Sequence, residues 1–401
     1  MSRLEELIQE LCPNGVEYKS ILECLSRPIT DGPHETPKLV EKGIPFISVE
    51  AIHDGKVDLS KCRGYITKEY DDLCAKKYKP QKGDVFLVKS ASIGRVAMVD
   101  TNDDFNIWSP LAAMRCNINI IKPRFLFYLL QTDRIQKLVV KKCSKSSQPN
   151  LSMRVLEQFV VPVPPLKVQD EIVRILDNFT ELTAELTAEL TARKEQYKYY
   201  RDELLCPVNG DYNKYLLKEI GKVRMCKRIM KDQTSVTGDV PFYKIGTFGK
   251  QADSYISYDL FEEYKNKFSY PNKGDILISC SGTIGRTVVF DGEDAYFQDS
   301  NIVWLENDEK IVLNKYLFYV YQLMPFKIST GGTIPRLYNS GIEETEIYAP
   351  SLEEQQRIVD ILDKFDAYCN DLTQGLPAEI ELRKQQYEYY RDKLLSFKEL
   401  K

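Results

Sequence analysis

Two stretches of the chain carry apolar residues three or four positions apart, the spacing of one face of an α-helix. The first stretch follows three prolines at positions 162–165, and we expect a helix to start just after them. Two such stripes should pack together as an antiparallel pair, because neither face is stable in water. Two unrelated helices, each buried in its own domain, are the alternative. The stripe residues are Ile172, Ile175, Phe179, Leu182, Leu186 and Leu190, then Ile358, Ile361, Phe365 and Leu372.

The first stripe runs through the tract TAELTAEL at 183–190. Ala, Glu and Leu are strong helix formers, and a four-residue period keeps successive leucines on one face, so the tract predicts a regular helical spacer. Each tetrapeptide adds about 6 Å of length and about 40° of rotation. An ordinary helix that grew by tract duplication is the alternative. The second stripe is interrupted by Gly375-Leu376-Pro377, where the proline is expected to kink or break the helix.

Short apolar runs elsewhere predict strands. VFLV at 85–88 and ILIS at 276–279 each follow a Lys-Gly-Asp turn and precede a glycine-containing kink, SIGR or TIGR. Gly94 and Gly285 are therefore expected in a hairpin or bulge with positive φ. A phosphate-binding P-loop does not fit, because neither segment has the GxxxxGK[ST] spacing.

The chain repeats itself over roughly half its length. KGDVFLVKSASIGRVAMVD at 82–100 recurs as KGDILISCSGTIGRTVVFD at 273–291, and RKEQYKYYRDELL recurs as RKQQYEYYRDKLL. A repeat this long is a duplicated domain plus helix rather than a solenoid module. We predict an α+β protein in which two long antiparallel, coiled-coil-like helices separate two similar domains. The predicted parts are an N-terminal helix at 1–12, domains at 13–162 and 206–350, and helices at 163–205 and 351–401.

The net charge of −4 conceals a difference between the domains. Residues 13–162 carry +6 and residues 206–350 carry −2, while the three helix-rich segments are all negative. A basic domain beside negative helices fits a protein that meets DNA with some faces and other proteins with others. The mild acidity of the second domain requires that DNA contacts there come from local basic clusters.

The remaining composition limits the chemistry. Ten cysteines contain no CxxC, and there are two histidines, so a zinc site is not expected and the thiols should be reduced and structural. The charged N-terminus and the lack of any run of about 18 apolar residues predict a cytoplasmic protein with no membrane association.

Motifs for catalysis are missing from the sequence. An adenine methyltransferase needs [DN]PP[FY] and a glycine-rich cofactor turn, but the one Pro-Pro pair, Pro164-Pro165, follows Val163. A motor would need a P-loop. The string Asp259, Glu263, Lys265 is more typical of a solvated helix face than of a nuclease metal site. We therefore expect binding without catalytic residues.

The ordered duplication resembles the specificity subunits of type I restriction-modification enzymes. The resemblance covers essentially the whole chain and rests on TDGPHETP, GIPFIS, the two KGD segments, SSQPNLS, PLKVQDEIVRILD, the TAEL tract and RKEQYKYYRDELL. It implies two target-recognition domains of mixed α/β type that each read one half of a bipartite, interrupted site in double-stranded DNA. It also implies that the short N-terminal helix joins the helical pair, which gives the chain a circular pseudo-twofold arrangement. It also implies helical regions that set the spacing and bind two methyltransferase subunits, with endonuclease/translocase subunits able to join. S-adenosylmethionine, ATP and Mg are expected in those partner subunits and not in this chain.

Candidate DNA contacts are polar and basic residues on predicted loops, since phosphates position a protein and base edges specify the sequence. Basic solvated helices and polar turns are the alternative for several of them. In the first domain the candidates are His34, Thr36, Lys38, Lys89, Ser90, Ser92, Arg95, Lys141, Lys142, Lys145, Ser146, Gln148 and Asn150. In the second they are Lys227, Arg228, Lys231, Ser279, Ser281, Thr283, Arg286, Thr330, Thr333, Arg336 and Asn339.

Two other functions stay open at this point. One is a stand-alone DNA modification or restriction enzyme with degenerate motifs, which would bind S-adenosylmethionine without a partner. The other is a coiled-coil adaptor that does not touch DNA, against which the basic loops argue.

Overall fold

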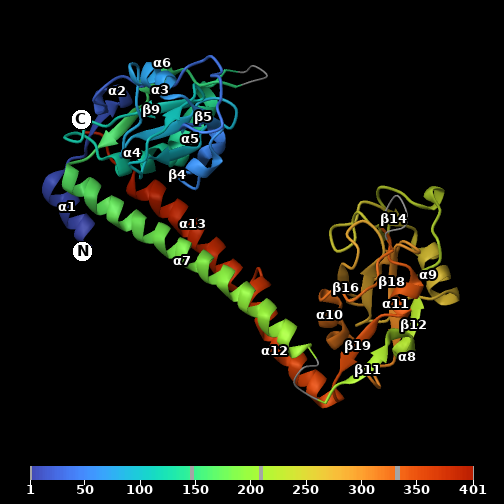
Figure 1. Cartoon of the computed structure of the whole chain (residues 1–401). Helices are drawn as coiled ribbons and strands as arrows, with labels where there is room; N and C mark the ends of the chain where they lie inside the picture. The colour runs from blue at the N-terminus through green and yellow to red at the C-terminus, as the bar shows by residue number, and fades with distance from the viewer. Residues whose placement is uncertain (1, 145–148, 207–210, 330–334, 401) are drawn as a thin grey trace. The chain divides into compact units, whose positions relative to one another are not determined.

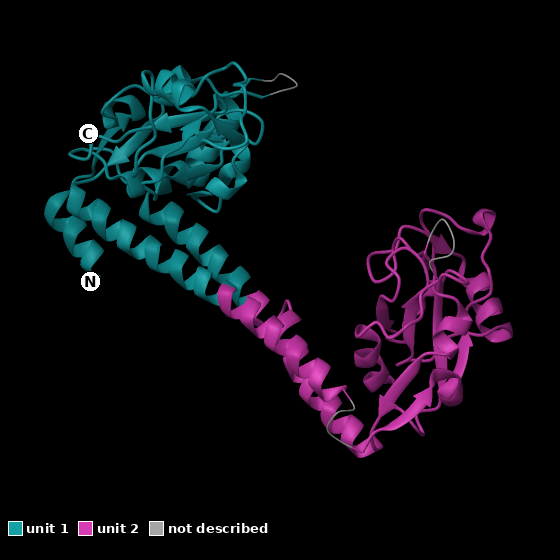
Figure 2. Ribbon diagram, in the orientation of Figure 1, with its two compact units in different colours: residues 1–187, 379–401 teal, residues 188–378 magenta. Residues whose placement is uncertain are grey.

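The computed structural model describes residues 2–144, 149–206, 211–329 and 335–400. The chain forms two compact units (Figure 2): unit 1 contains residues 1–187 and 379–401, and unit 2 contains residues 188–378. Each unit therefore combines one of the two similar domains with parts of the long helices.

Unit 1 is coloured from blue to green in Figure 1, with its C-terminal segment in red. It contains a five-stranded sheet in the order β3-β4-β7-β6-β9, a three-stranded sheet β5-β2-β8 and the two-stranded ladder β1-β10. Helix α4 packs on β6 and β7, and its buried face extends the core to the long helix α7. The elements are α1 (Arg3–Leu11), β1 (Glu17–Ser20), α2 (Ile21–Cys24), β2 (Ile44–Ile47), η1 (Val49–Ala51), β3 (Ile52–His53), β4 (Lys56–Val57), η2 (Leu59–Lys61), β5 (Gly64–Ile66), α3 (Lys68–Ala75), β6 (Val85–Val88), β7 (Val96–Met98), β8 (Asn106–Ile107), β9 (Leu111–Met114), α4 (Pro123–Gln131), α5 (Asp133–Lys142), α6 (Met153–Glu157), β10 (Val160–Val163) and α7 (Leu166–Leu204).

Unit 2 contains the four-stranded sheet β12-β18-β15-β16, the three-stranded sheet β14-β13-β17 and the ladder β11-β19. Helix α10 packs on β15 and β16 as α4 does on β6 and β7. The elements are β11 (Asn213–Leu216), α8 (Leu217–Ile220), β12 (Gly221–Arg224), η4 (Lys231–Gln233), β13 (Val240–Tyr243), β14 (Tyr255–Ile256), α9 (Tyr258–Lys267), β15 (Ile276–Ser279), β16 (Thr287–Val289), β17 (Tyr296–Phe297), β18 (Ile302–Asn307), α10 (Asn314–Gln322), α11 (Asn339–Glu343), β19 (Glu346–Ala349) and α12 (Leu352–Asn370); α13 (Leu376–Leu394) begins in unit 2 and continues in unit 1.

The duplicated sequence produces the same strand pairing twice. The parallel pair β2–β8 joins Phe46 to Asn106, and the equivalent pair β13–β17 joins Phe242 to Tyr296. The KGD segments form the hairpins β6–β7 and β15–β16, whose turns contain Gly94 at φ +92° and Gly285 at φ +78°. The predicted positive φ at both glycines and the α+β class with two similar domains are thus confirmed.

A buried glutamine fixes the start of each long helix in the same way. In unit 1 the Gln169 amide donates to Ile120 O and Pro164 O, and its oxygen accepts from the Lys122 N–H at 2.8 Å. In unit 2 the Gln355 amide donates to Ile311 O and Pro350 O, and its oxygen accepts from the Leu313 N–H at 2.8 Å. Each side chain thereby ties three otherwise unpaired backbone groups to the first turn of a helix.

Helix pairing exchanges segments between the two repeats. In unit 1 the ring of Phe179 in α7 stacks on Tyr390 in α13, with centroids 5.5 Å apart. In unit 2 the equivalent pair is Phe365 in α12 and Tyr200 in α7, 6.0 Å apart. Because each YYRD segment packs against the helix of the other repeat, the compact unit is a permuted version of the sequence repeat. This exchange is the circular arrangement that the family resemblance implies.

The two ends of the chain meet in unit 1. Helix α1 begins at a capping box formed by Ser2 and Glu5, and its apolar residues join the core around α7. The Val16 N–H donates to Lys398 O at 2.9 Å, and the Tyr18 hydroxyl donates to Phe397 O at 2.7 Å. The N-terminal helix therefore packs with the helical region, as expected from the sequence.

The predicted apolar stripe needs two corrections. Leu372 lies beyond the end of α12 at Asn370 and is 80% exposed, because the chain turns away there before α13 begins. Leu182 lies in α7 but is 38% exposed, so it does not belong to the buried face. The remaining stripe residues are buried or half-buried: Ile172, Ile175, Phe179, Leu186, Leu190, Ile358, Ile361 and Phe365. The predicted break is confirmed, since α12 ends before Gly375 and Pro377 lies in the first turn of α13.

Replacing Gln355 by Leu should destabilise unit 2 by about 2–4 kcal/mol, because the backbone groups of Ile311, Leu313 and Pro350 lose their partner. Denaturant unfolding can be followed by the fluorescence of Trp304 in a Trp108→Phe background, which leaves one tryptophan, in unit 2. Gln356→Leu is the matched control, because Gln356 is exposed and bonds only to Asp360 one turn away. Equal stability of the two variants would contradict the role of Gln355.

Candidate nucleic-acid interface

A short loop between β8 and β9, residues 108–110, organises one face of unit 1; we call it hub loop 1. The Ser109 N–H donates to Pro33 O at 3.3 Å, and the Lys89 N–H donates to Pro110 O at 2.9 Å. Ser90 in turn forms a β-bridge with Asn150. These bonds place the TDGPHETP loop, the end of β6 and the segment around Asn150 side by side.

The TDGPHETP loop carries three of the predicted residues on its exposed side. His34, Thr36 and Lys38 are exposed, while Asp31 is buried. A Cβ at Gly32 would lie 1.8 Å from Ile107 O, so only glycine allows the loop to run this close to β8. The close approach holds the three side chains next to hub loop 1.

The basic cluster after α5 is adjacent to the same face. Lys141 and Lys142 are exposed in the last turn of α5. The Ser144 N–H donates to Asn150 O at 3.0 Å, which connects the helix end to the segment that pairs with Ser90. Ser92, in the β6–β7 turn, is exposed as well. Lys145, Ser146 and Gln148 lie outside the described residues.

Unit 2 contains the equivalent loop between β17 and β18, residues 298–301, which we call hub loop 2. The Cys280 N–H donates to Asn301 O at 2.7 Å, and the Ser281 hydroxyl donates to Asn301 Oδ1 at 2.8 Å. Arg336 donates to Ser300 O at 2.7 Å, and Arg228 pairs with Asp299 at 2.9 Å. Three predicted residues therefore surround this loop: Arg228, Ser281 and Arg336.

The other described candidates of unit 2 are less tightly held. Lys227, Lys231 and Thr283 are exposed. Arg228 and Lys231 border a hollow of about 630 Å³ that hub loop 2 also lines. Asn339 is half-buried at the first position of α11. Thr330 and Thr333 lie outside the described residues.

Four residues that were predicted to contact DNA from exposed positions are buried or half-buried. Lys89 is buried, and its ammonium group lies 3.3 Å from the Asp31 carboxylate. Ser279 is buried, and its hydroxyl closes the β15–β16 turn by bonding to Thr283 O and the Arg286 N–H. Arg95 and Arg286 are half-buried and donate to equivalent backbone carbonyls, Ile52 O and Phe248 O. These polar groups stabilise the hairpins, because buried donors and charges require partners.

Sequence reasoning missed residues that the fold brings to the hub loops. The Arg63 guanidinium lies 4.1 Å from the ring centre of Trp108 in hub loop 1, a cation–π contact on an exposed arginine. In unit 2, Lys244 pairs with Asp253 beside the hollow. The repeat could have pointed to these places, because the hub loops are short segments that differ between two otherwise similar copies.

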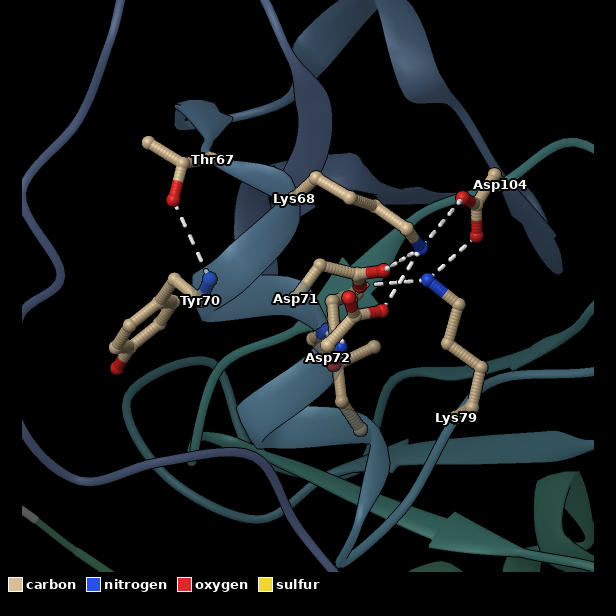
Figure 3. A network of polar contacts seen from close by, with 9 residues as sticks. Thr67, Lys68, Tyr70, Asp71, Asp72, Lys79 and Asp104 are labelled. Carbon is tan, nitrogen blue, oxygen red and sulfur yellow. Dashed lines mark hydrogen bonds and ion pairs between the residues drawn. The ribbon is translucent and has the colours of Figure 1, made fainter.

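A buried carboxylate anchors the strand that leads into hub loop 1 (Figure 3). Asp71 in α3 accepts from Lys79 at 2.6 Å, from Lys68 at 3.0 Å and from the Asn106 amide at 3.0 Å. Because Asn106 is the first residue of β8, this network ties α3 to the base of the loop. Burial works to raise the pKa of Asp71, but the hydrogen bonds from Lys79, Asn106 and Lys68 outweigh it and hold the pKa below its ordinary value.

The described residues contain no group of three or more His, Cys, Asp or Glu side chains that could hold a metal ion. Burial raises the pKa of the Cys24 thiol to about 11 and that of Cys116 to about 12. Thiols of this kind are protonated at neutral pH and are poor nucleophiles. No described helix is long and apolar enough to cross a membrane.

The architecture thus defines a class of protein: two similar α/β heads, each with a polar loop face, joined by helices that exchange between repeats. The family described as the type I restriction modification DNA specificity domain matches residues 31–195 and 209–382. The chain is 55% identical to the putative type I restriction enzyme specificity subunit S.HindORF215P of Haemophilus influenzae over 284 residues, 68% of this chain and 72% of that protein. It is 32% identical to the EcoR124I/EcoR124II specificity subunit of Escherichia coli over 73% of this chain and 76% of that protein.

Solved structures show the same fold. A chain from a structure on complex assembly and conformational transition of the type I R-M system superposes with a TM-score of 0.61 at 18% identity, covering 96% of this chain and 98% of that one. The HsdS subunit from Thermoanaerobacter tengcongensis gives a TM-score of 0.52 at 20% identity, covering 96% and 97%. The chain belongs to the family of type I restriction-modification DNA specificity subunits, and the resemblance noted from its motifs is confirmed.

Replacing Asp71 by Asn should destabilise unit 1 by about 1–3 kcal/mol at pH 7. The pKa of Asp71 in the folded protein lies below the value near 4 of an unfolded chain. The carboxylate therefore stabilises unit 1 fully above about pH 4, and this contribution is lost as the pH falls through the folded-state pKa. The difference between variant and wild type should therefore shrink on acidification. Hydrogen exchange of the peptide around β8 at pH 7 and near pH 3 measures it.

Asp72→Asn is the control for this prediction. Asp72 contacts the same Lys68 at 3.1 Å, but its side chain is 63% exposed, so its loss should change stability by less than about 0.5 kcal/mol. A pH-independent effect of Asp71→Asn would show that the carboxylate charge is not what holds β8.

Proposed function

We propose that the two units read the two halves of a bipartite, interrupted site in double-stranded DNA, and that this chain supplies the sequence specificity of a type I restriction-modification complex without catalysing a reaction itself. The observation that carries the proposal is the duplicated hub loop. The backbone bond from the Lys89 N–H to Pro110 O in hub loop 1 recurs as the bond from the Cys280 N–H to Asn301 O in hub loop 2, while the side chains that the loops present differ. One scaffold with two different polar faces suits two different base sequences.

Phosphate contacts and base contacts divide among the residues of each face. Lys38, Lys141 and Lys142 in unit 1 are exposed cations around hub loop 1 and suit phosphates. His34, Thr36 and Asn150, with Arg63 on Trp108, carry the donors and acceptors suited to base edges. In unit 2, Lys227 and Lys231 take the phosphate role. Ser281, Asn301 and Arg228 lie at hub loop 2 and take the role of reading bases.

The partner surface repeats as well. Tyr389 in α13 is 61% exposed and Tyr199 in α7 is 59% exposed. Each leans edge-on against the next tyrosine, Tyr390 or Tyr200, which packs on the neighbouring helix. Exposed aromatic side chains on a rigid helix are typical anchors of protein interfaces. Two equivalent anchors support two copies of one methyltransferase subunit, with endonuclease/translocase subunits able to join the complex.

Cofactors are assigned to these partners. S-adenosylmethionine would bind in the methyltransferase subunits, and ATP and Mg in a translocating subunit. The relative from Escherichia coli is itself named as the specificity subunit of a type I restriction enzyme, which supports such a division of labour.

Co-expression of the chain with the methyltransferase subunit encoded beside it, followed by genome-wide mapping of methylated adenines, tests the proposal. We expect one bipartite motif. Changes in unit 1, such as His34→Ala with Thr36→Ala, should weaken or relax one half by about 1–3 kcal/mol per lost base contact. The change Asn301→Asp should affect only the other half. Methyl transfer by the purified chain alone, or changes that affect both halves alike, would overturn the proposal.

The anchor tyrosines predict a change in stoichiometry. Tyr389→Ser and Tyr199→Ser should each reduce the number of bound methyltransferase subunits from two to one, and the double variant should bind none, as measured by native mass spectrometry. Large buried anchors cost about 2–4 kcal/mol on truncation. Gln385→Ser, an exposed change one turn before Tyr389, is the control. Two subunits retained by the double variant would exclude these tyrosines as anchors.

A further inference from the structure

A hollow of about 340 Å³ in unit 1 is not explained by the hub loops. It lies where the β3–β4 turn, the β6–β7 turn, the end of α4 and α13 come together. His53, Arg95, Gln131 and Arg391 contribute polar side chains to its lining. We call it the Arg95 hollow.

Two buried N–H donors at the Arg95 hollow lack a hydrogen-bond partner within the described part of the chain: Arg95 Nε and Gln131 Nε2. Arg95 Nη1 donates to Ile52 O at 3.1 Å, and Gln131 Oε1 accepts from the Tyr387 hydroxyl at 3.4 Å, so a contact holds each side chain beside the hollow. Buried donors in folded proteins are almost always paired. Two unpaired donors at one hollow indicate a ligand with acceptor atoms.

The charge at the hollow favours an anion. The Arg391 side chain is 11% exposed; its Nε contacts Asp392 Oδ1 at 3.1 Å, and its guanidinium lies 5.6 Å from the ring centre of Tyr387. With Arg95 it supplies two guanidinium groups, against one carboxylate, Asp54, among the residues that line the hollow. Two arginines with an amide N–H are suited to the oxygen atoms of a phosphate group.

The equivalent place in unit 2 is built differently. Arg201, the counterpart of Arg391, donates to Gln322 Oε1 at 3.4 Å, and Gln322 also accepts from the Tyr197 hydroxyl. Next to Gly285 lies the thioether of Met324, where Gly94 of unit 1 has the amide of Gln136. Within the described residues of unit 2, an apolar side chain and a paired arginine thus replace the donors that line the hollow in unit 1.

We propose that the Arg95 hollow binds a phosphate group, supplied in the DNA complex by the backbone of the duplex that hub loop 1 reads. The β6–β7 turn connects the two places, since Ser90 pairs with Asn150 beside the hub loop and Arg95 borders the hollow five residues later. A phosphate held by a preformed pocket next to base-reading loops fixes the register of the protein on DNA. The proposal of a phosphate site is based on the geometry of the hollow, and the proposal that DNA supplies the phosphate rests on the proposed function.

The first experiment titrates inorganic phosphate into the full chain and follows the arginine Nε–H signals by NMR. The Arg95 signal, assigned by its loss in Arg95→Lys, should shift in wild type and in Arg201→Gln, the matched control from unit 2. It should shift at least tenfold less in Arg391→Gln and in Gln131→Leu, two variants that remove different donors. Unchanged unfolding midpoints verify that the variants fold. A wild-type signal that does not respond to phosphate overturns the site.

The second experiment measures DNA binding by the complex with its methyltransferase subunits at several salt concentrations. Loss of one phosphate contact in Arg391→Gln should reduce the slope of log K against log salt by about 1 and leave the methylation motif unchanged. Arg201→Gln should leave the slope unchanged. A phosphate response with an unaltered slope in Arg391→Gln would overturn the duplex as the source and leave free phosphate as the ligand. If the wild-type complex binds no DNA, the proposed function fails, while the phosphate titration still decides the site.

Discussion

The exchange of helical segments between repeats is the contact on which each unit depends. The Phe179–Tyr390 ring contact joins α7 to α13 in unit 1, and the Phe365–Tyr200 ring contact joins α12 to α7 in unit 2. In both pairs the phenylalanine and the tyrosine come from different sequence repeats, so one copy of the repeat cannot bury its helix face alone. The burial of these apolar faces makes the central and C-terminal helices part of both units and brings the chain ends together beside Val16.

The same exchange separates structural chemistry from recognition chemistry. Residues that repeat between units, such as Gln169 with Gln355, bond to backbone groups and hold the starts of helices in place. The hub loops are among the segments whose residues differ between the units. Because these glutamines bond to backbone groups outside the loops, the loops can carry different side chains without leaving the glutamine donors unpaired.

The duplication also places small differences next to large similarities. Unit 1 anchors β8 through the carboxylate of Asp71, while in unit 2 the equivalent strand β17 is buried among aromatic rings such as Tyr270 and Tyr264. The stabilisation by Asp71 depends on the charge of its carboxylate and so on pH, whereas aromatic packing carries no such charge. The Arg95 hollow is a further difference between the units: in unit 2 Gln322 accepts a hydrogen bond from Arg201, while in unit 1 the equivalent residues Gln131 and Arg391 line the hollow.

Periodicity and internal repetition were sufficient to predict the long helices, the break before Pro377, the positive φ at Gly94 and Gly285, and two similar α/β domains. Such features depend on local spacing and on chain conformation, which neighbouring residues control. Burial of polar side chains could not be predicted in this way. Lys89 follows the apolar run VFLV and Ser279 ends the run ILIS, so each borders a polar turn that looks exposed in the sequence, and Leu372 continues an apolar spacing beyond the end of its helix. Whether such residues face solvent depends on partners far along the chain, such as Asp31 for Lys89, and these contacts exist only once the strands and helices have packed.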